Sequence, residues 1–287
     1  MKRVAVFGIA GFSGRHFERF IASEGLARKF EFVGFGRDLG RAEHSGSFIY
    51  HEGDACEQAA VTKFVDEVRP AYVLNLVGIF RAESFEQYVA VHVGVAQSIC
   101  DAVRLWDPEI QKLVLIGSAA EYGSRVSNPV REDAEAQPIS EYGLSKLYQT
   151  LLCGYFFRNH RLPAVVARTF NILGDGLSPQ LSIGNFVKQI AALRDGGTIR
   201  VGNLSTSRDF LNIAEVARRY WQLLIKGAPG EVYNVCSGVP RTINSVLEEL
   251  IRESGKRLSI ETDPSLLRER DVESIYGDST KYNQLGL

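Results

Sequence analysis

The 287-residue sequence predicts an α/β fold, in which a doubly wound parallel sheet is joined to a smaller C-terminal lobe. The first observation is a short strand, Arg3–Phe7, that leads through closely spaced glycines into a helical pattern over 15–24. The second is the regular alternation of strand and helix patterns up to about residue 170, which is typical of βαβ units. We therefore expect a cofactor-binding domain at 1–170 and a substrate-binding lobe at 171–287. Segments near 208–225 and 231–236 are expected to return to the first domain.

Composition excludes several classes of protein. The chain is 23% charged and 45% hydrophobic with a net charge of −1, so no basic surface predicts a nucleic-acid partner. No apolar run is long enough to cross a membrane, and Lys2 and Arg3 lead directly into a strand without a signal peptide. The four cysteines lack disulfide or metal-site spacing. We expect a cytoplasmic protein with buried, reduced thiols and no metal.

The glycine-rich turn has the spacing G-x-x-G-x-x-G, with glycines at Gly8, Gly11 and Gly14 and with Phe12 and Ser13 between the last two. A strand before and a helix after such a turn are the context that a dinucleotide needs. Glycines there let the backbone approach a pyrophosphate at the N-terminus of the helix. The alternative is a glycine turn without a ligand.

The second strand, 30–35, bears on the choice of cofactor because it ends in Gly34-Phe-Gly-Arg37. A site for NAD usually has an acidic residue here that binds the ribose 2′-hydroxyl, whereas a cation suits the 2′-phosphate of NADP. Arg37 therefore favours NADP(H). Asp38 could still reach a ribose hydroxyl, so NAD stays possible.

The next elements supply further candidates along the cofactor. Asp54 follows a third strand at 48–51, where it could bind the adenine amino group or cap a helix that begins near Ala55. Asn75 lies at the end of a fourth strand, 71–76, where the backbone would pass the cofactor. The helix predicted over 85–106 is apolar nearly all round, which indicates deep burial or a subunit contact.

The candidate chemistry follows the fifth strand, 112–116. Ser118 comes just after it, and ligand-facing groups of an open parallel sheet lie beyond the carboxyl ends of the strands. Tyr142 and Lys146 open a later helix, where a spacing of four places both on one face. We expect the ammonium to lower the pKa of the phenol, which prepares Tyr142 for proton transfer near neutral pH. An exposed helix face with no catalytic role is the alternative.

Together these residues resemble the extended short-chain dehydrogenase/reductases, a Rossmann-fold group of NAD-dependent epimerases and dehydratases that act on nucleotide sugars. The second half is most similar to the GDP-4-keto-6-deoxy-mannose reductase and GDP-mannose 4,6-dehydratase group. The matching stretches run through the whole chain: Gly8–Gly14, Ser118–Gly123, Tyr142–Lys146, Arg168–Gly174, Ser207–Phe210, Tyr233–Gly238 and Leu267–Arg268.

The resemblance implies a role for each matching residue. Tyr142 would donate or accept the proton, Lys146 would also hold the nicotinamide ribose, and Ser118 would bind the reacting carbonyl. Asn171, Arg208 and Arg268 would bind the nucleotide diphosphate-sugar, which suits the bidentate guanidinium group. An ion pair of Arg208 with Asp209 or Glu215, and a solvated loop position for Arg268, are the alternatives.

Three reactions use this apparatus: reduction of a keto-sugar, epimerisation with bound NAD, and 4,6-dehydration. Dehydration needs an additional acid and base, which the family's dehydratases place between the serine or threonine and the following tyrosine. Ala119 and Ala120 occupy those places here, and an extended strand end would turn Glu121 to the opposite side. Reduction by NADPH is favoured, epimerisation stays open, and dehydration is the least favoured. A cofactor-binding scaffold without catalysis is the non-enzymatic alternative.

The sequence departs from the resemblance at two places. The family often has an asparagine in the long helix, where this chain has Val91 followed by His92. His92 could replace it by hydrogen bonding, or could be a buried histidine with a purely structural role. The segment at 277–287 resembles one that relatives follow with a further helix, which we expect to be missing here. The resemblance also implies a homodimer through helices 85–106 and 142–157.

Overall fold

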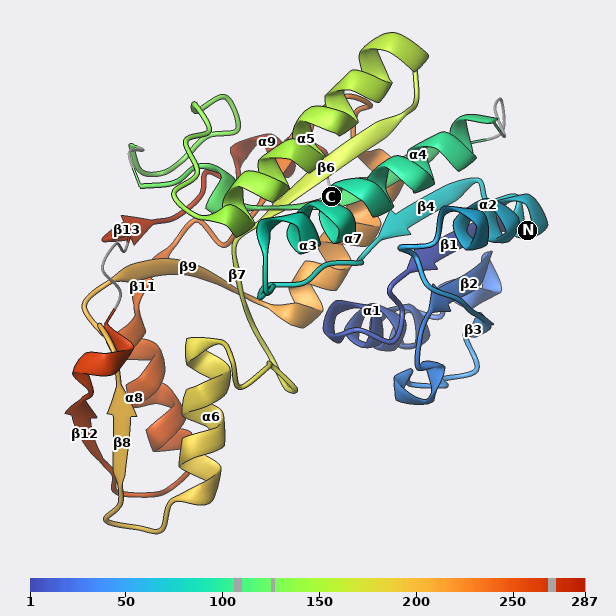
Figure 1. The fold of residues 1–287 in the computed structure, drawn as a ribbon. Coiled ribbons are helices and arrows are strands. Elements are labelled where there is room, and N and C mark those ends of the chain that lie inside the picture. Colours follow the sequence, from blue (N-terminus) through green and yellow to red (C-terminus); the bar gives the residue numbers. More distant parts are fainter. Residues whose placement is uncertain (106–109, 125–126, 268–271, 287) are drawn as a thin grey trace.

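The computed structural model describes residues 1–105, 110–124, 127–267 and 272–286, and its main feature is a parallel sheet of seven strands (Figure 1). The strand order is β10-β6-β5-β4-β1-β2-β3. The strands are β1 (Lys2–Phe7), β2 (Phe30–Gly36), β3 (Phe48–Glu52), β4 (Tyr72–Asn75), β5 (Lys112–Ser118), β6 (Ala164–Thr169) and β10 (Val232–Val235). Every pairing in this sheet is parallel, as a doubly wound α/β fold requires.

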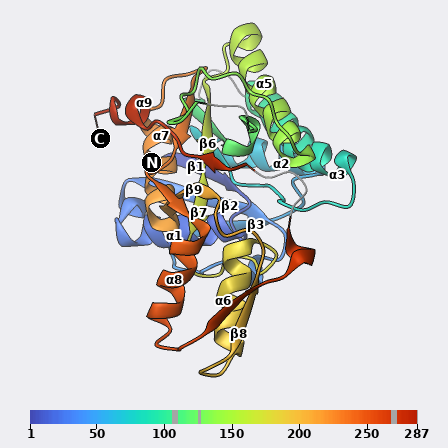
Figure 2. The same cartoon turned by 90° about the vertical axis from the view of Figure 1, so that its left-hand side faces the viewer.

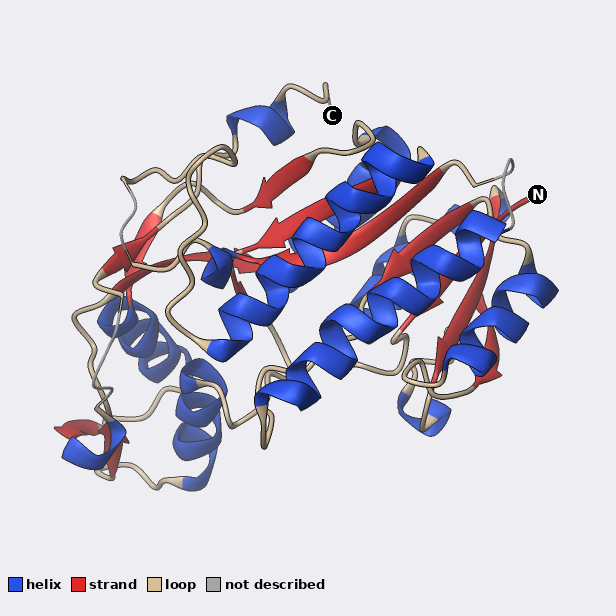
Figure 3. Cartoon of the chain, turned by 45° about the horizontal axis from the view of Figure 1, so that its top comes forward, coloured by secondary structure: helices blue, strands red, loops and turns tan. Residues whose placement is uncertain are grey.

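Helices cover both faces of the sheet (Figures 1 and 3). One face carries α2 (Gln58–Val68), α3 (Phe85–Val89), α4 (Val95–Leu105) and α5 (Glu141–His160), and the other carries α1 (Phe12–Ser23) and α7 (Ile213–Lys226). The strands supply alternate residues to the two sides. In β1, Ala5 and Phe7 pack under α2 and α4, whereas Val4 and Val6 pack under α1 and α7. Burial on both sides explains why the strands are almost continuously apolar.

The strand order reverses between β1 and β4, and this position is where ligands bind in open α/β sheets. The loops that leave the two strands lie beside each other. The amide of Leu76 donates to the carbonyl of Phe7 at 3.0 Å, and the amide of Gly8 donates to Phe35 at 2.8 Å. The glycine-rich turn and the loop after β4 therefore share one edge of the sheet.

The long helix predicted over 85–106 differs from the expectation in two ways. It consists of α3, a π-helical turn at Ala90–Gly94, and α4, while Trp106 lies outside the described residues. Its C-terminal part is amphipathic and not apolar all round: Ile99, Cys100 and Val103 are buried, whereas Gln97 is exposed. The expectation that this helix is apolar nearly all round was therefore wrong.

A smaller group of elements lies at one end of the sheet in two perpendicular views (Figures 1 and 2). Helices α6 (Ser182–Ala192) and α8 (Ile243–Glu253) pack with β8 (Thr198–Val201) and β12 (Ser259–Thr262) around a separate apolar core. A second small sheet joins β7 (Asn171–Leu173), β9 (Ser207–Asn212), β11 (Pro240–Thr242) and β13 (Ser274–Ile275), and α9 (Thr280–Asn283) packs beside β10. We propose a cofactor domain at 1–170, rejoined by α7 and β10, and a substrate lobe formed by the remainder.

Two further expectations concern the whole chain. Among the described residues, no helix combines the length and apolar character that a membrane span requires. All four cysteines are free, and three of them are buried. Cys56 is exposed, so the prediction that all four thiols are buried was wrong for this residue.

Candidate active site

Ser118 ends β5 and begins a 3₁₀ turn at Ala119–Glu121. Its hydroxyl accepts a hydrogen bond from the amide of Ala120 at 3.2 Å, while its own amide donates to the Glu121 carboxylate at 2.7 Å. This reciprocal arrangement is a capping box, which fixes the turn in place. The turn therefore holds the Ser118 hydroxyl at the carboxyl end of the sheet.

Glu121 is fully buried, and its carboxylate accepts hydrogen bonds from three neighbouring residues. One carboxylate oxygen accepts from the Ser118 amide, and the other accepts from Thr150 at 2.8 Å and from Arg168, whose Nη2 lies 2.9 Å away. The predicted extended geometry was wrong, because these residues form a 3₁₀ turn. Both carboxylate oxygens of Glu121 nevertheless accept hydrogen bonds from these protein groups.

Tyr142 stands in the first turn of α5, which begins after Ser140, whose hydroxyl accepts from the amide of Gly143 at 3.1 Å. The glycine lets this turn approach the Ser118 turn closely, because a Cβ on Gly143 would lie 2.4 Å from the carbonyl oxygen of Ala120. The Tyr142 ring packs edge-on against Tyr88 and His92, with centroids 6.0 and 5.6 Å away. The sheet edge therefore brings Ser118 and Tyr142 together.

Burial raises the pKa of Tyr142 above its usual value, while the hydrogen bond with Ser118 opposes this and the charge of Glu121 adds to it. Lys146 is also buried, and its ammonium donates to the carbonyl of Ile116 at 2.9 Å and to Gln149 at 3.2 Å. Burial lowers the pKa of Lys146 to about 8, against the attraction of Glu121. The expected lowering of the Tyr142 pKa was therefore wrong for this arrangement, because burial of the phenol raises its pKa and Lys146 is not among the groups that shift it.

Three polar residues around this pair were not singled out from the sequence. Ser145 and Gln149 lie three and seven positions after Tyr142, on the same side of α5, and both are buried. Gln149 donates to the carbonyl of Ile116 at 3.1 Å, and Ser145 donates to the carbonyl of Tyr142 at 2.8 Å. Thr150 binds Glu121. The helical spacing was the signal that could have identified Ser145 and Gln149.

The glycine-rich turn is compatible with a bound pyrophosphate. Helix α1 begins after Gly11, and no side chain of a described residue caps it, so its first amides are available to an anion. Gly14 allows the tight fold of the turn, because a Cβ there would lie 2.2 Å from the carbonyl oxygen of Ile9. Phe12 and Ser13 form the first turn of α1 between these glycines.

The other predicted cofactor residues lie along the same edge. Arg37 follows β2 and pairs with Asp54 at 3.4 Å. Asp54 also accepts from the amide of Cys56 at 2.9 Å, but α2 begins only at Gln58, so the predicted helix cap at Asp54 was wrong. Asn75 is buried, and its side chain accepts from the amide of Val77 at 3.0 Å, which fixes the turn after β4.

The substrate residues proposed from the resemblance lie on the smaller lobe or outside the described residues. Asn171 is exposed at the start of β7, which pairs with β9, the strand that contains Arg208. Arg208 donates to the carbonyls of Ser207 and Val272 at 2.8 and 2.6 Å. Arg268 lies outside the described residues.

The two acids considered as partners of Arg208 have other partners. Asp209 accepts hydrogen bonds from the amides of Ser237, Gly238 and Gly277. Glu215 pairs with Arg219 at 3.0 Å and with Arg218. Both carboxylates therefore bind groups other than the Arg208 guanidinium.

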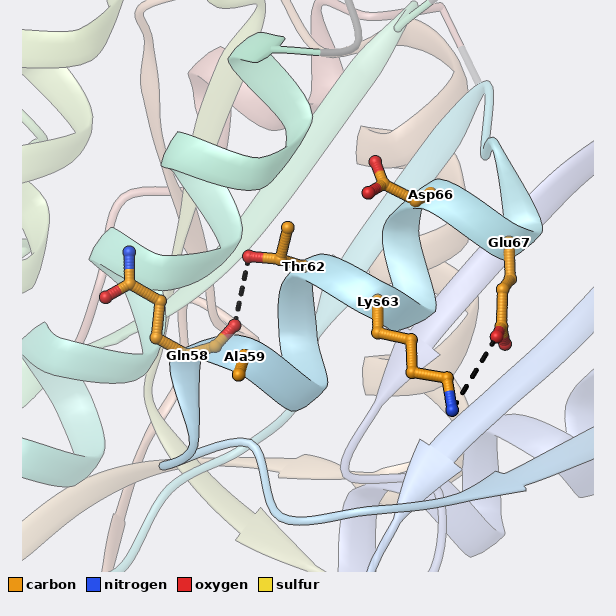
Figure 4. Close-up of a pocket in the computed structure, with 6 residues that line it drawn as sticks. All are labelled: Gln58, Ala59, Thr62, Lys63, Asp66 and Glu67. Atoms are coloured by element: carbon orange, nitrogen blue, oxygen red, sulfur yellow. Dashed lines mark hydrogen bonds and ion pairs between the residues drawn. The ribbon is translucent and has the colours of Figure 1, made fainter.

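Among the described residues, no group of histidine, cysteine, aspartate and glutamate side chains has the arrangement of a metal site. A shallow hollow on the outer face of α2 contains none of the predicted site residues (Figure 4). It is lined by Gln58, Ala59, Thr62, Lys63, Asp66 and Glu67.

Comparison with known proteins identifies the family. Residues 4–236 match the model of the NAD dependent epimerase/dehydratase family. The chain belongs to this family. A GDP-6-deoxy-D-mannose reductase of Pseudomonas aeruginosa is 26% identical over 98% of this chain and 89% of the relative. A dTDP-6-deoxy-L-talose 4-dehydrogenase (NAD(P)(+)) of Kitasatospora kifunensis is 27% identical over 99% of this chain and 86% of the relative.

Solved structures agree in fold. A UDP-glucose 4-epimerase of Thermotoga maritima, solved with UDP-glucose, superposes with a TM-score of 0.85 at 20% identity, over 99% of this chain and 92% of that one. The predicted Rossmann-like α/β fold and the resemblance to the family are thus confirmed. In sequence the chain resembles a reductase and a dehydrogenase that are named for nucleotide sugars, and in fold it resembles a UDP-glucose 4-epimerase.

Proposed function

We propose that this protein is an NADP(H)-dependent reductase of a 4-keto nucleotide sugar. The observation that carries the proposal is the commitment of Glu121 to Ser118, Thr150 and Arg168, next to Ala119 and Ala120. No carboxylate of this turn remains to remove a proton or to assist the departure of water, as 4,6-dehydration requires. A hydroxyl pair, Ser118 and Tyr142, remains for carbonyl chemistry.

The protonation state of Tyr142 supports reduction. A phenol whose pKa lies above its usual value of about 10 is protonated at neutral pH, so Tyr142 can donate its proton to the alkoxide that forms from the carbonyl. Ser118 would hold the same oxygen from the end of β5 and polarise the carbonyl. Lys146 would hold the nicotinamide ribose and stabilise the phenolate that remains. When bound, the reduced nicotinamide supplies the hydride.

The preference for NADP(H) rests on the edge beyond β2. Arg37 is 73% exposed, and within the described part of the chain its ion pair is a 3.4 Å contact with Asp54, so it can turn towards a 2′-phosphate at small cost. Bidentate guanidinium contacts suit a phosphate group. Asp54 would then be available to bind the adenine amino group. NAD remains the cofactor of the competing epimerase proposal.

The finer substrate proposal is a GDP-4-keto-6-deoxy-mannose, by similarity to the reductase of P. aeruginosa. Asn171, Arg208 and Arg268 are the residues that we propose to bind the nucleotide diphosphate-sugar. An epimerase with bound NAD is the second candidate, because the family that the chain matches includes epimerases and the Ser118–Tyr142 pair would serve both reactions. A cofactor-binding scaffold is the candidate from a different class.

One experiment separates these proposals. The purified protein is incubated with NADPH and a panel of 4-keto nucleotide sugars, and both the nicotinamide absorbance and the sugar products are followed. We expect equal amounts of NADPH consumed and hydroxy-sugar formed. Interconversion of sugars without net consumption of cofactor would contradict the reductase and favour the epimerase, and NADPH binding without any product would favour the scaffold.

We also propose a homodimer that uses the helices at 85–106 and 142–157. Three large side chains on α5 are exposed although they are apolar or aromatic: Tyr148, Leu151 and Tyr155 are 42%, 57% and 48% exposed. Leu105 at the end of α4 is 73% exposed. A second copy of the chain would cover this surface. Light scattering is expected to give the mass of a dimer at micromolar concentration, and a monomer for Leu151→Arg.

A further inference from the structure

His92 lies in the candidate site, against Tyr142 and Ser145, and is the neighbour of Val91, which takes the place where the family often has an asparagine. It is 1% exposed and lies in the π-helical turn Ala90–Gly94. Its ring stacks on Tyr88, with centroids 5.7 Å apart, and meets the ring of Tyr142 edge-on. π-helical turns inside long helices are frequent at functional sites, so the residues of this turn, including His92, are candidates for a functional role.

The hydrogen bonds of His92 determine its tautomer. The amide of Ile79 lies 3.1 Å from Nε2, and because an amide can only donate, Nε2 must be the unprotonated acceptor. In a neutral ring the proton is then on Nδ1, which lies 2.8 Å from the hydroxyl oxygen of Ser145. The Ser145 hydroxyl in turn donates to the carbonyl of Tyr142 at 2.8 Å.

This chain of bonds joins two elements that must keep a fixed separation. One end is the loop after β4, at 77–79, and the other is the first two turns of α5, which carry Tyr142 and Lys146. His92 and Lys146 converge on the same place in that loop: a Cβ on Gly78 would lie 3.6 Å from Nε2 and 3.5 Å from the Lys146 ammonium nitrogen. The imidazole thus spans the space between the loop and the helix.

The same contacts keep the ring neutral. Burial and the neighbouring Lys146 cation lower the pKa of His92 to about 3. The amide of Ile79 donates to Nε2, a bond that only the unprotonated nitrogen can accept. Among the described residues, the other groups in contact with the ring are the phenols of Tyr88 and Tyr142 and the Ser145 hydroxyl, none of which is a carboxylate. His92 is therefore not available as an acid or base at neutral pH.

We propose that His92 is a positioning residue, a neutral Nδ1-protonated imidazole that fixes the first two turns of α5, with Tyr142 and Lys146, against the loop at 77–79. The effect on turnover rests on the proposed function, in which Tyr142 delivers the proton. The bridge itself does not depend on it. Because a small displacement of a proton donor lowers turnover strongly, loss of the bridge should reduce kcat more than substrate binding.

Three variants test the bridge. His92→Phe keeps a ring of similar size but removes both hydrogen bonds, Ser145→Ala removes the middle link, and the double variant removes both. We expect kcat to fall at least tenfold in His92→Phe and severalfold in Ser145→Ala, with KM for the keto-sugar and Kd for NADPH within about threefold. The double variant should be no slower than His92→Phe, since both changes cut one chain.

The matched control is Ile99→Ala, seven residues further along the same long helix. Ile99 is fully buried in the core and should lower the melting temperature while leaving kcat unchanged. The proposal would be overturned if His92→Phe had the kcat of the wild type. It would also be overturned if the two single-variant reductions in kcat multiplied in the double variant.

A second measurement needs no turnover, so it separates this proposal from the proposed function. Nitrogen-15 NMR of histidine-labelled wild-type protein should show the Nδ1-protonated tautomer of His92 unchanged from pH 8 to pH 5. Hydrogen exchange of the amides at 77–79 and 142–146 should be faster in His92→Phe and unchanged in Ile99→Ala. An Nε2-protonated ring, titration near pH 6.5, or unchanged exchange would each overturn the bridge, even if no keto-sugar proves to be a substrate.

Discussion

Two polar pairs of this protein differ in how they are held. Glu121 and Arg168 lie in the interior, with side chains 0% and 4% exposed and atoms 2.9 Å apart. Arg37 and Asp54 lie at the cofactor edge, with side chains 73% and 30% exposed and atoms 3.4 Å apart. Both pairs join an arginine to a carboxylate that follows a strand or its turn, yet only the first is enclosed.

The difference indicates how the two tasks of the protein are divided. An interior pair cannot exchange its partner for water, so the Ser118 turn, β6 and α5 are locked together around the candidate chemistry. An exposed pair contributes little to stability and can rearrange around a ligand. The apparatus for proton transfer is therefore fixed before a ligand binds, whereas cofactor discrimination depends on a side chain that can change partner.

The largest expected effect is the loss of stability when the interior pair, Glu121 and Arg168, is broken. Glu121→Gln preserves the shape but leaves the Arg168 guanidinium buried without a counter-charge, so we expect the free energy of unfolding to fall by about 3–5 kcal/mol. Urea unfolding followed by circular dichroism measures it. A loss below about 1 kcal/mol would show that the interior pair contributes no more to stability than the exposed pair does.

The next effect concerns the dependence of stability on pH. His92 has a folded pKa of about 3 and an ordinary value of 6.5, so the unfolded chain binds a proton between these values and the folded protein does not. Stability from this group is complete above pH 6.5 and is lost as the pH falls towards 3. When the pH falls from 7 to 4, the free energy of unfolding of His92→Phe should decrease by about 3 kcal/mol less than that of the wild type. Parallel pH profiles in urea unfolding would refute the buried, neutral state.

A smaller effect is expected at the cofactor edge. Arg37→Ser should weaken NADPH binding about tenfold, or about 1.4 kcal/mol, and leave NADH binding nearly unchanged. Quenching of intrinsic fluorescence by each nucleotide gives both values. Arg218→Ser, which removes an exposed arginine of α7, is the matched control. Equal weakening for NADPH and NADH would remove the basis for the preference for NADP.

The smallest effect is expected for an exposed pair in the substrate lobe. Arg257 and Asp195 lie 2.7 Å apart, with side chains 91% and 49% exposed, so solvent screens their attraction. Asp195→Asn should leave the urea midpoint unchanged within error. A loss as large as that of Glu121→Gln would mean that burial does not distinguish the pairs.

The parts of the site that the sequence predicted are those that depend on local pattern. The glycine spacing, the strand that ends at Ser118, and the four-residue interval between Tyr142 and Lys146 are all short-range features, and the rules of parallel sheets bring their ends together. The Glu121–Arg168 pair was missed because its partners are 47 positions apart and meet only through the pairing of β5 with β6.

His92 could not be assigned from the sequence for a different reason. In this sequence Val91 takes the place where the family often has an asparagine, and His92 is its neighbour. The π-helical turn at Ala90–Gly94 changes the rotation per residue, so regular helical spacing does not tell which of the two side chains faces Tyr142. Similarly, the raised pKa of Tyr142 follows from the degree of enclosure, which a motif does not contain.

The most direct test of the central claim compares the wild type with Tyr142→Phe in the presence of NADPH and a 4-keto nucleotide sugar. The substitution removes only the transferable proton and its oxygen, so the account predicts an unchanged Kd for NADPH and a kcat lower by a factor of about 10²–10⁴. A Tyr142→Phe enzyme that consumes NADPH at the wild-type rate would contradict the assignment of Tyr142 as the proton donor.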